Sequence, residues 1–417
     1  MTTTSNNLQL SVLTKILRLA TLLIVSTLAS SMIVISSAVA DDAAGYFSGT
    51  YQEARYKFLQ SAQAAGARVE SYLHPDAGPD DLPLYTDVAL IGPNNAESVL
   101  VLASGTHGVE GFAGSAVQAG VFHEGIASQL PPKMQLIMIH AVNPYGFAHG
   151  RRFNEDNVDI NRNFVNHSKP YPGNPGYEAL ADIIFPQSLS FWEATKARVK
   201  LLWYRLTDGR LQLRRAISHG QFTHPDGLFF GGNSETWSNK TLYRVIRGHL
   251  LQSKRVVFIG FHTGLGEYAA AEVIMNVGRN SPAFTRAIAC WGDLVRTTMS
   301  GESVSIQPFG PVKLAIPGML PQAEVTAVSL EFGTFPISEV FWALRAENWL
   351  HNRGGPEYPE RDSIRAELLT VFYPADASWK QDIWNKGKDV IEKAIYCLGE
   401  LANDEGEVPV DRMPPNQ

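Results

Sequence analysis

The hydrophobic pattern of the chain contains five short apolar runs that predict β-strands. They cover residues 87–92, 98–104, 134–142, 255–262 and 325–332. The runs are nearly continuous rather than alternating, which is typical of strands that are buried on both faces of a sheet. Helical patterns lie between some of them, so the order predicts an α/β fold with a mostly parallel or mixed central sheet flanked by helices.

Helical spacing of apolar residues predicts the elements that surround this sheet. Residues 45–66 show such spacing and end in a glycine, so an N-terminal helix is expected there. A largely helical insertion is expected around residues 168–250, covering one side of the sheet. Two further helical stretches are predicted around residues 342–351 and 379–401. No linker divides residues 41–417, which we therefore expect to form one domain.

The first forty residues have the features of an export signal. Lys15 and Arg18 precede a long uncharged stretch that ends in Ala38-Val39-Ala40, directly before two aspartates. A basic start, an apolar middle and a small-x-small end predict a secretory signal peptide, residues 1–40, cleaved after Ala40. The mature chain would be exported, either periplasmic or secreted. The alternative is a retained anchor, in which case the membrane would be a partner of the N-terminus.

Composition excludes one class of partner and leaves one covalent question open. The 417 residues are 45% hydrophobic and 18% charged, with a formal net charge of −6, and no Lys/Arg stripe is present. No nucleic-acid partner is therefore expected. The chain has two cysteines, Cys290 and Cys397. In an exported protein they could form one disulfide or remain two buried thiols, and their spacing does not decide between these.

Polar residues of catalytic type follow four of the predicted strands. His107 and Glu110 come after the second run, and an arginine- and asparagine-rich segment, residues 143–164, follows the third. His262 ends the fourth run, and Glu331 lies near the end of the fifth. Because ligands gather at the carboxyl ends of strands in open α/β sheets, these side chains are expected to meet.

The residue types indicate a hydrolytic metal site. Two histidines and one glutamate leave one tetrahedral position of Zn²⁺ open for water, and that water becomes acidic enough to ionise near neutral pH. Burial of Glu331 should make it basic enough to accept a proton from such a water. Guanidinium groups in a cleft bind carboxylates and stabilise oxyanions. Each motif alone is weak, but their joint occurrence at strand ends is specific.

The same motifs resemble those of the zinc carboxypeptidase (M14-type) superfamily in order and spacing. More narrowly, the chain resembles the uncharacterised M14-like family DUF2817. Five segments carry this resemblance: GTHGVEGFAGSA, NPYGFAHGRRFNEDNVDINRNF, GQFTHPDGLFFGG, FHTGLG and LEFGT. The resemblance covers nearly all of residues 41–417 and implies a zinc-carboxypeptidase-like single domain.

The resemblance also implies roles for individual residues. One Zn²⁺ per chain would be bound by three residues: His107, Glu110 and His262. Glu331 would be the general base and then the general acid, and Arg152 would stabilise the carbonyl oxygen, with Arg151 as the alternative. Asn161 and Arg162 would bind a terminal carboxylate of the substrate.

The function implied is that of an exported zinc-dependent hydrolase of amide bonds, a metallocarboxypeptidase. Its substrate would be a peptide or an N-acyl amino acid with a free carboxylate. One alternative is a deacylase of the aspartoacylase or succinylglutamate desuccinylase type, since the spacing from Arg152 to Asn161 is closer to that branch. A non-catalytic binding protein is the other alternative. Residues 220–232, with His224 and the adjacent Asn233, are assigned no catalytic role.

Overall fold

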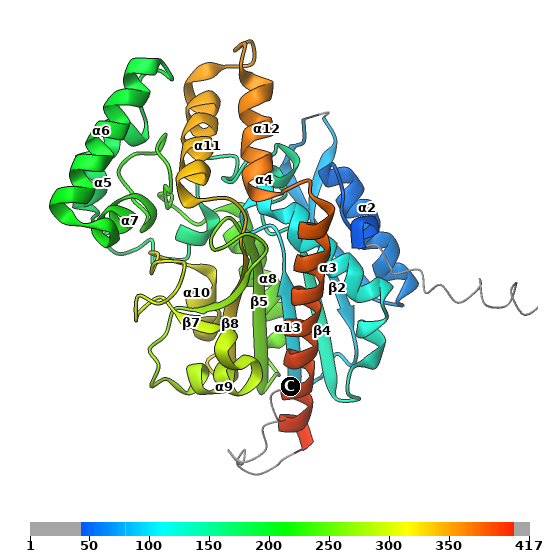
Figure 1. Ribbon diagram of the computed structural model, residues 1–417. Coiled ribbons are helices and arrows are strands. Elements are labelled where there is room, and N and C mark those ends of the chain that lie inside the picture. The colour runs from blue at the N-terminus through cyan, green and yellow to red at the C-terminus, as the bar shows by residue number, and fades with distance from the viewer. Residues whose placement is uncertain (1–42, 80, 404–417) are drawn as a thin grey trace, which may run out of the picture. The chain divides into compact units, whose positions relative to one another are not determined.

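A mixed β-sheet forms the centre of the fold in the computed structural model, which describes residues 43–79 and 81–403 (Figure 1). Within these residues the strand order is β1-β2-β4-β3-β5-β8-β6-β7. The strands are β1 (Arg68–Ala77), β2 (Pro83–Ile91), β3 (Ser98–Ala103), β4 (Met134–His140), β5 (Arg255–Thr263), β6 (Ala271–Met275), β7 (Val295–Thr297) and β8 (Glu324–Phe332). The predicted α/β fold with a mixed sheet flanked by helices is confirmed.

The four central strands, β4, β3, β5 and β8, run parallel to one another. Antiparallel strands flank them, with β2 beside β4 and β6 beside β8. Every residue of β3 and β4 is buried, as the continuous apolar runs predicted. The carboxyl ends of the four parallel strands therefore lie along one edge of the sheet.

Helices cover both faces of this sheet. On one face, the largest apolar cluster joins the sheet to α2 (Tyr51–Ala64), α3 (Gly111–His123), α9 (Pro282–Trp291) and α13 (Ala377–Asn403). On the other face, a second cluster joins it to α8 (Trp237–Leu250) and α10 (Val312–Met319). The short elements are η2 (Ala43–Tyr46), η3 (Gly108–Glu110), η4 (Ile126–Gln129), α4 (Pro144–Ala148), η5 (Ile160–Arg162), η6 (Gly292–Leu294) and η7 (Leu350–Gly354).

Of the helical insertion expected to cover the sheet, only α8 does so. The other three helices of the insertion are α5 (Pro175–Ile184), α6 (Phe191–Asp208) and α7 (Arg210–Ser218). Their buried side chains pack against α11 (Ile337–Trp349) and α12 (Arg361–Phe372) in a third apolar cluster. This group of helices stands apart from the sheet faces (Figure 1).

Two other expectations are modified by local structure. The predicted helix 45–66 is divided into η2 and α2, because the Thr50 side chain caps α2 by accepting a hydrogen bond from Glu53 N. Cys290 of α9 and Cys397 of α13 form a disulfide, which decides the question that the sequence left open. The predicted signal peptide, residues 1–40, lies outside the described residues. Among the described helices none is both long enough and apolar enough to span a bilayer.

Candidate metal centre and substrate cavity

The predicted site residues gather at the carboxyl ends of the central strands. His107 and Glu110 lie in the turn after β3, and His262 is the penultimate residue of β5. Glu331 lies in β8, where it is the register partner of His262 on the neighbouring strand. Paired residues of adjacent strands point to the same face of a sheet, so this register places the two side chains beside each other.

The turn after β3 is held in place by the segment that follows β4. The backbone N–H of Gly108 donates to the Arg152 carbonyl at 3.1 Å, and that of Val109 donates to the Arg151 carbonyl at 2.8 Å. A Cβ atom on Gly108 would lie only 2.0 Å from the carbonyl carbon of Gly146. Glycine is therefore required for this close approach of the two loops.

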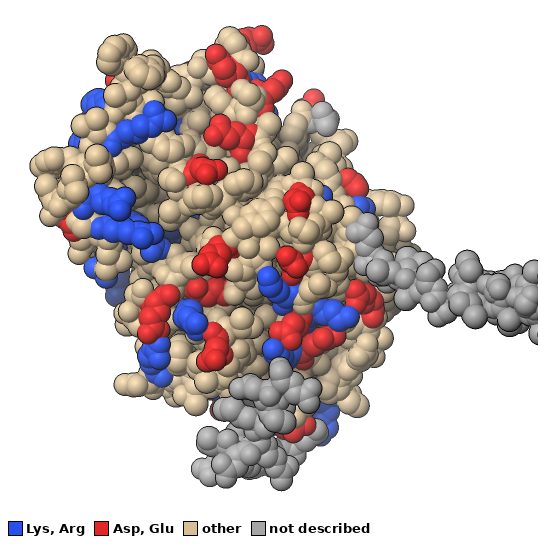
Figure 2. Space-filling view, in the orientation of Figure 1, with Lys and Arg blue, Asp and Glu red and all other residues tan. Residues whose placement is uncertain are grey.

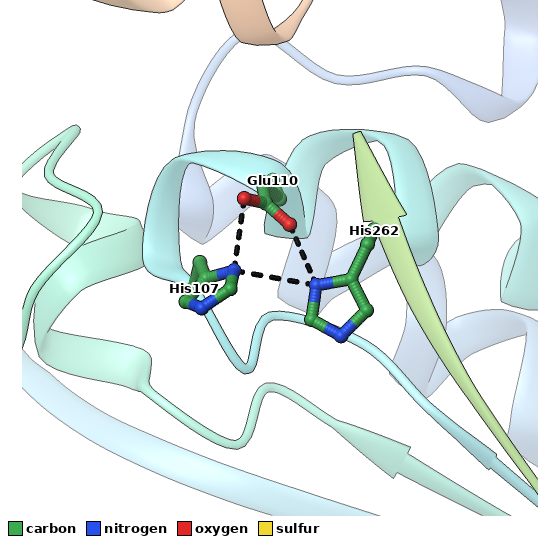
Figure 3. A group of neighbouring side chains, drawn as sticks. All are labelled: His107, Glu110 and His262. Carbon is green, nitrogen blue, oxygen red and sulfur yellow. Dashed lines mark hydrogen bonds and ion pairs between the residues drawn. The ribbon is translucent and has the colours of Figure 1, made fainter. Parts of the chain in front are cut away.

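Three buried side chains, two from this turn and one from β5, converge beside it (Figure 3). His107 Nδ1 lies 2.9 Å from Glu110 Oε1, and His262 Nδ1 lies 2.8 Å from Glu110 Oε2. The two Nδ1 atoms are 3.2 Å apart. One ligand atom from each residue lies within 4.8 Å of the others, so the group could hold a metal ion. Ligand atoms around a tetrahedral Zn²⁺ are roughly 3.3 Å apart, close to this spacing.

The partner on the far side of the His107 ring supports this fit. Its Nε2 atom lies 3.0 Å from Asp159 Oδ1, on the side of the ring away from Glu110. A neutral imidazole has one N–H and one lone pair, so an Nε2–H that donates to Asp159 leaves the Nδ1 lone pair facing Glu110 and His262. In that tautomer His107 could bind a cation through Nδ1, as in sites where a carboxylate orients a histidine ligand.

Arg152 is part of the same cluster. Its Nη1 donates to Glu110 Oε1 at 2.7 Å, and its Nη2 lies 2.9 Å from His107 Nε2. The same Nη2 donates to Asp159 Oδ2 at 3.3 Å, so it has a carboxylate acceptor of its own. Burial would raise the pKa of Asp159, but Arg162, His107 and Arg152 hold that pKa well below its ordinary value. Asp159 therefore stays ionised beside the candidate ligands.

The pKa values of Glu110 and Glu331 shift in opposite directions although both side chains are buried. Burial opposes ionisation of Glu110, but His107, His262 and Arg152 hold its pKa well below the ordinary value. Burial raises the pKa of Glu331 well above the ordinary value, and the negative charge of Glu110 adds to this effect. Glu331 Oε1 accepts one hydrogen bond, from Leu265 N at 3.1 Å. One carboxylate is thus suited to bind a cation and the other to exchange a proton.

Asn161 and Arg162 lie in η5, at the wall of the same cavity. The Arg162 Nη2 atom donates to the Ser218 carbonyl at 2.7 Å, while its Nε is buried without a hydrogen-bond partner among the described residues. Gly220, with φ of +109°, packs against the Arg162 side chain, where a Cβ would lie 2.8 Å from Cδ. Burial lowers the pKa of Arg162 to about 10. A guanidinium with a free Nε–H in a cavity is suited to receive a carboxylate.

The structure separates the two adjacent arginines. Arg151 points away from the cavity and pairs with Glu347, with Nε 2.6 Å from Oε1. It also donates to the Asn157 side chain at 2.9 Å. Arg152 lines the cavity and Arg151 does not. Of the two, Arg152 is therefore the one in position to contact a bound molecule.

The segment 220–232 contributes Phe229 to the cavity, but its histidine, His224, lies elsewhere. His224 Nε2 lies 2.8 Å from Glu178 Oε2, and neither residue lines the cavity. Phe229 does line it, and its ring centroid lies 5.5 Å from the guanidinium carbons of both Arg152 and Arg162. This segment thus contributes one aromatic wall of the cavity.

A cavity of about 590 Å³ connects these groups. It is lined by the candidate ligands, Arg152, Asn161, Arg162 and Glu331, and by apolar residues of α6, α7 and α11. This volume is typical of sites that bind small molecules or the ends of peptides.

Residues 47–386 match the model of the family described as "Protein of unknown function (DUF2817)". The chain belongs to the DUF2817 family. The expected family resemblance is therefore confirmed. No curated protein is a significant match.

Several solved structures are similar to this DUF2817 chain at low identity. Carboxypeptidase A from Helicoverpa armigera is 12% identical, with 85% of this chain and 75% of that chain covered and a TM-score of 0.46. Bovine thrombin-activatable fibrinolysis inhibitor is also 12% identical, with 85% and 98% covered and a TM-score of 0.46. Succinylglutamate desuccinylase from Chromobacterium violaceum is 15% identical, with 76% and 74% covered and a TM-score of 0.32. At these values the likeness assigns neither activity nor substrate to the chain.

Two residues of the DUF2817 site were missed from the sequence. Asp159 lies in the segment 143–164, between Arg152 and Asn161, which the sequence analysis named. Its position two residues before Asn161 was the available signal. Lys313 of α10 lines the cavity and is buried. Its surroundings in the sequence, PVKLAI, gave no sign of a site.

Proposed function

We propose that the protein is an exported zinc-dependent hydrolase of amide bonds, acting as a metallocarboxypeptidase. The observation that carries this proposal is the convergence of His107, Glu110 and His262 at a cavity that Glu331 also lines. Two imidazole nitrogens and a carboxylate are the ligand set of hydrolytic zinc sites. Bound there, Zn²⁺ would lower the pKa of a water molecule from ~15.7 to about 7 and polarise the scissile carbonyl.

The residues of the chain would each perform one part of the hydrolysis. Glu331 takes a proton from the attacking water and later gives it to the leaving amine. Arg152 stabilises the negative charge that develops on the carbonyl oxygen. The C–N bond of the amide breaks, the carbonyl carbon gains the oxygen of water, and the products are a carboxylic acid and an amine.

Asn161 and Arg162 would bind a carboxylate next to the scissile bond. The Arg162 Nε–H is free to donate, and the Asn161 side chain is fixed because its Oδ1 accepts from Val312 N at 3.0 Å. A fixed amide and a guanidinium that together receive a carboxylate would place the amide bond reproducibly in front of Glu331.

A second candidate function is a deacylase of N-acyl amino acids. The observation that favours it is that α6 and α7 form one wall of the cavity, through Leu201, Leu213 and Ile217. Such a wall limits the length of substrate that can extend beyond the scissile bond.

Export is supported by the signal-like residues 1–40 and by the disulfide, because disulfides persist in oxidising compartments.

The test is incubation of the zinc-loaded protein with three groups of compounds: peptides with a free carboxylate, C-terminally amidated peptides, and N-acyl amino acids. Mass spectrometry should show loss of single C-terminal residues, blocked by amidation. Cleavage of the acyl compounds alone would identify the deacylase. Glu331→Gln should abolish turnover while zinc stays bound. Turnover that survives either this substitution or the removal of metal by a chelator would contradict the proposal.

A further inference from the structure

The cavity is more cationic than the proposed hydrolysis requires. Two of its cations, Arg152 and Arg162, are used for the carbonyl oxygen and the carboxylate in the proposed function. Four others line the same cavity: Arg205, Arg210, Arg214 and Lys313. The acidic residues that line it are Glu110 and Glu331, which the proposed mechanism already uses. An excess of one sign of charge in a cavity concentrates ligands of the opposite sign.

Lys313 provides the buried part of this positive charge. It is 8% exposed, and its Nζ donates to the Ile274 carbonyl and to Ser329 Oγ, each at 3.1 Å. An ammonium group has three donors, so one remains for a ligand. Within residues 43–79 and 81–403, Lys313 forms no ion pair. Burial lowers its pKa to about 7, and a bound anion would favour its charged form.

Lys313 lies beside the groups that would bind substrate. The residue before it, Val312, donates its backbone N–H to the Asn161 side chain at 3.0 Å. Its partner Ser329 precedes Glu331 by two positions in β8, so both point to the same face of the strand. The charges of Glu331 and Arg162 both act on Lys313, so it lies near the proposed general base and the proposed carboxylate-binding arginine.

The three remaining arginines lie on the α6–α7 hairpin. Arg205 is in the last turn of α6, and Arg210 and Arg214 are four residues apart on one face of α7. None of them forms an ion pair with another described residue, although Arg214 donates to the Val304 carbonyl. Lys and Arg side chains gather over this part of the molecule (Figure 2). Like charges that lie close together repel one another, so an anion between them would be stabilising.

One carboxylate, Glu272, lies near enough to raise the pKa of both Arg214 and Lys313. It does not line the cavity, and it accepts hydrogen bonds from Ser303 Oγ at 2.5 Å and from Val304 N at 3.1 Å. Glu272 therefore does not neutralise the cavity from within.

We propose that the enzyme is selective for substrates whose leaving amine is an acidic amino acid, with Lys313 binding the side-chain carboxylate and the α6–α7 arginines attracting the dianion to the cavity. This inference rests on the proposed function. Asn161 and Arg162 would bind the α-carboxylate of the same glutamate or aspartate. The substrate class is then a peptide ending in Glu or Asp, or an N-acyl derivative of these acids.

The experiment compares ligands that differ in charge but have nearly the same shape. N-acetylglutamate and N-acetylglutamine are titrated calorimetrically into the zinc-loaded Glu331→Gln protein, so that no turnover is needed. A charge-assisted contact should give the glutamate compound about tenfold or higher affinity. Lys313→Met should remove most of this ratio. Equal affinity for the two compounds, or an unchanged ratio in Lys313→Met, would overturn the inference.

A matched pair of arginine variants tests the hairpin. Arg214→Gln should weaken binding of N-acetylglutamate, whereas Arg215→Gln, an exposed neighbour that does not line the cavity, should not. Equal effects of the two variants would contradict a role for the α6–α7 arginines. Binding and hydrolysis can fail separately. Selective binding without cleavage of any amide would leave this inference standing and refute the proposed function. Cleavage without charge preference would support the proposed function and refute this inference.

Discussion

Asp159 Oδ1 lies 3.0 Å from His107 Nε2, on the opposite side of the imidazole from Glu110. Asp159 is fully buried, and its Oδ1 also accepts from Asn161 N at 2.9 Å. One carboxylate therefore fixes both the orientation of a candidate metal ligand and the start of the turn that carries the proposed carboxylate-binding pair. Hydrogen bonds of this kind hold a histidine in the tautomer that can bind metal.

The first prediction concerns this contact. Asp159→Asn should weaken zinc binding about 10- to 100-fold, because the neutral amide no longer favours the Nε2–H tautomer of His107. Competition with a chromogenic chelator measures the zinc affinity directly. Asp156→Asn is the control, since Asp156 is exposed three positions away and does not line the cavity. Equal zinc affinity in both variants would show that Asp159 has no part in metal binding.

The second prediction separates the two adjacent arginines. Arg151→Met should lower the free energy of unfolding by about 3–5 kcal/mol, because it leaves Glu347 buried without its partner. Arg152→Met also removes a partner of the buried carboxylates Glu110 and Asp159, but in addition it should lower kcat/KM of the folded protein by about 10²–10³-fold, as expected when a stabilising donor is removed from a developing oxyanion. Urea unfolding and kinetics on the same preparations measure both effects. The assignment fails if Arg151→Met abolishes turnover of the folded protein.

The sequence predicted the centre of the sheet better than its edges. β3 and β4 are buried at every position, so their apolar runs were easily recognised. The two edge strands were missed, β1 because most of its residues are exposed or half-buried and β7 because it has only three residues. The short strand β6 beside β7, with five residues, was missed as well. Edge strands are defined by pairing with a distant neighbour, and that pairing leaves a weaker hydrophobic pattern.

The same physical difference decided which site residues could be predicted. His107, Glu110, His262 and Glu331 are polar residues at the ends of apolar runs, where they stand out. Lys313 does not, because it is buried only when α10 packs onto β8 and its amine reaches Ser329. Such a contact between separate elements depends on tertiary packing, which the local sequence does not show.

The third prediction concerns the disulfide between α9 and α13. Cys290 and Cys397 are 107 residues apart, so the cross-link restricts a long loop in the unfolded chain. Its removal should lower the free energy of unfolding by about 2–4 kcal/mol. Urea unfolding with and without dithiothreitol measures this difference. The double variant Cys290→Ser/Cys397→Ser should match the reduced protein and be insensitive to dithiothreitol; an unfolding curve that dithiothreitol does not shift in the parent protein would contradict the prediction.

The fourth prediction is a pH dependence of stability that originates in the core. His140 is fully buried at the end of β4, with its Nε2 2.9 Å from Ser115 Oγ and its ring stacked on Phe58 at a centroid distance of 4.7 Å. Burial lowers the pKa of His140 to about 4, although the charge of Asp87 opposes this. In the unfolded chain the pKa is about 6.5. Between these values the unfolded chain binds a proton that the folded chain does not.

The free energy of unfolding should therefore fall as pH decreases from about 6.5 to about 4, with His140 contributing about 3 kcal/mol to the loss. The measurement is urea unfolding of the parent protein and of His140→Gln at several pH values from 7 to 4.5. Gln cannot titrate in this range and can still reach Ser115, so its stability should fall less steeply. His224→Gln, which removes a half-buried histidine outside this part of the core, is the control. Parallel curves for the parent and His140→Gln would show that His140 is not the source of the acid sensitivity.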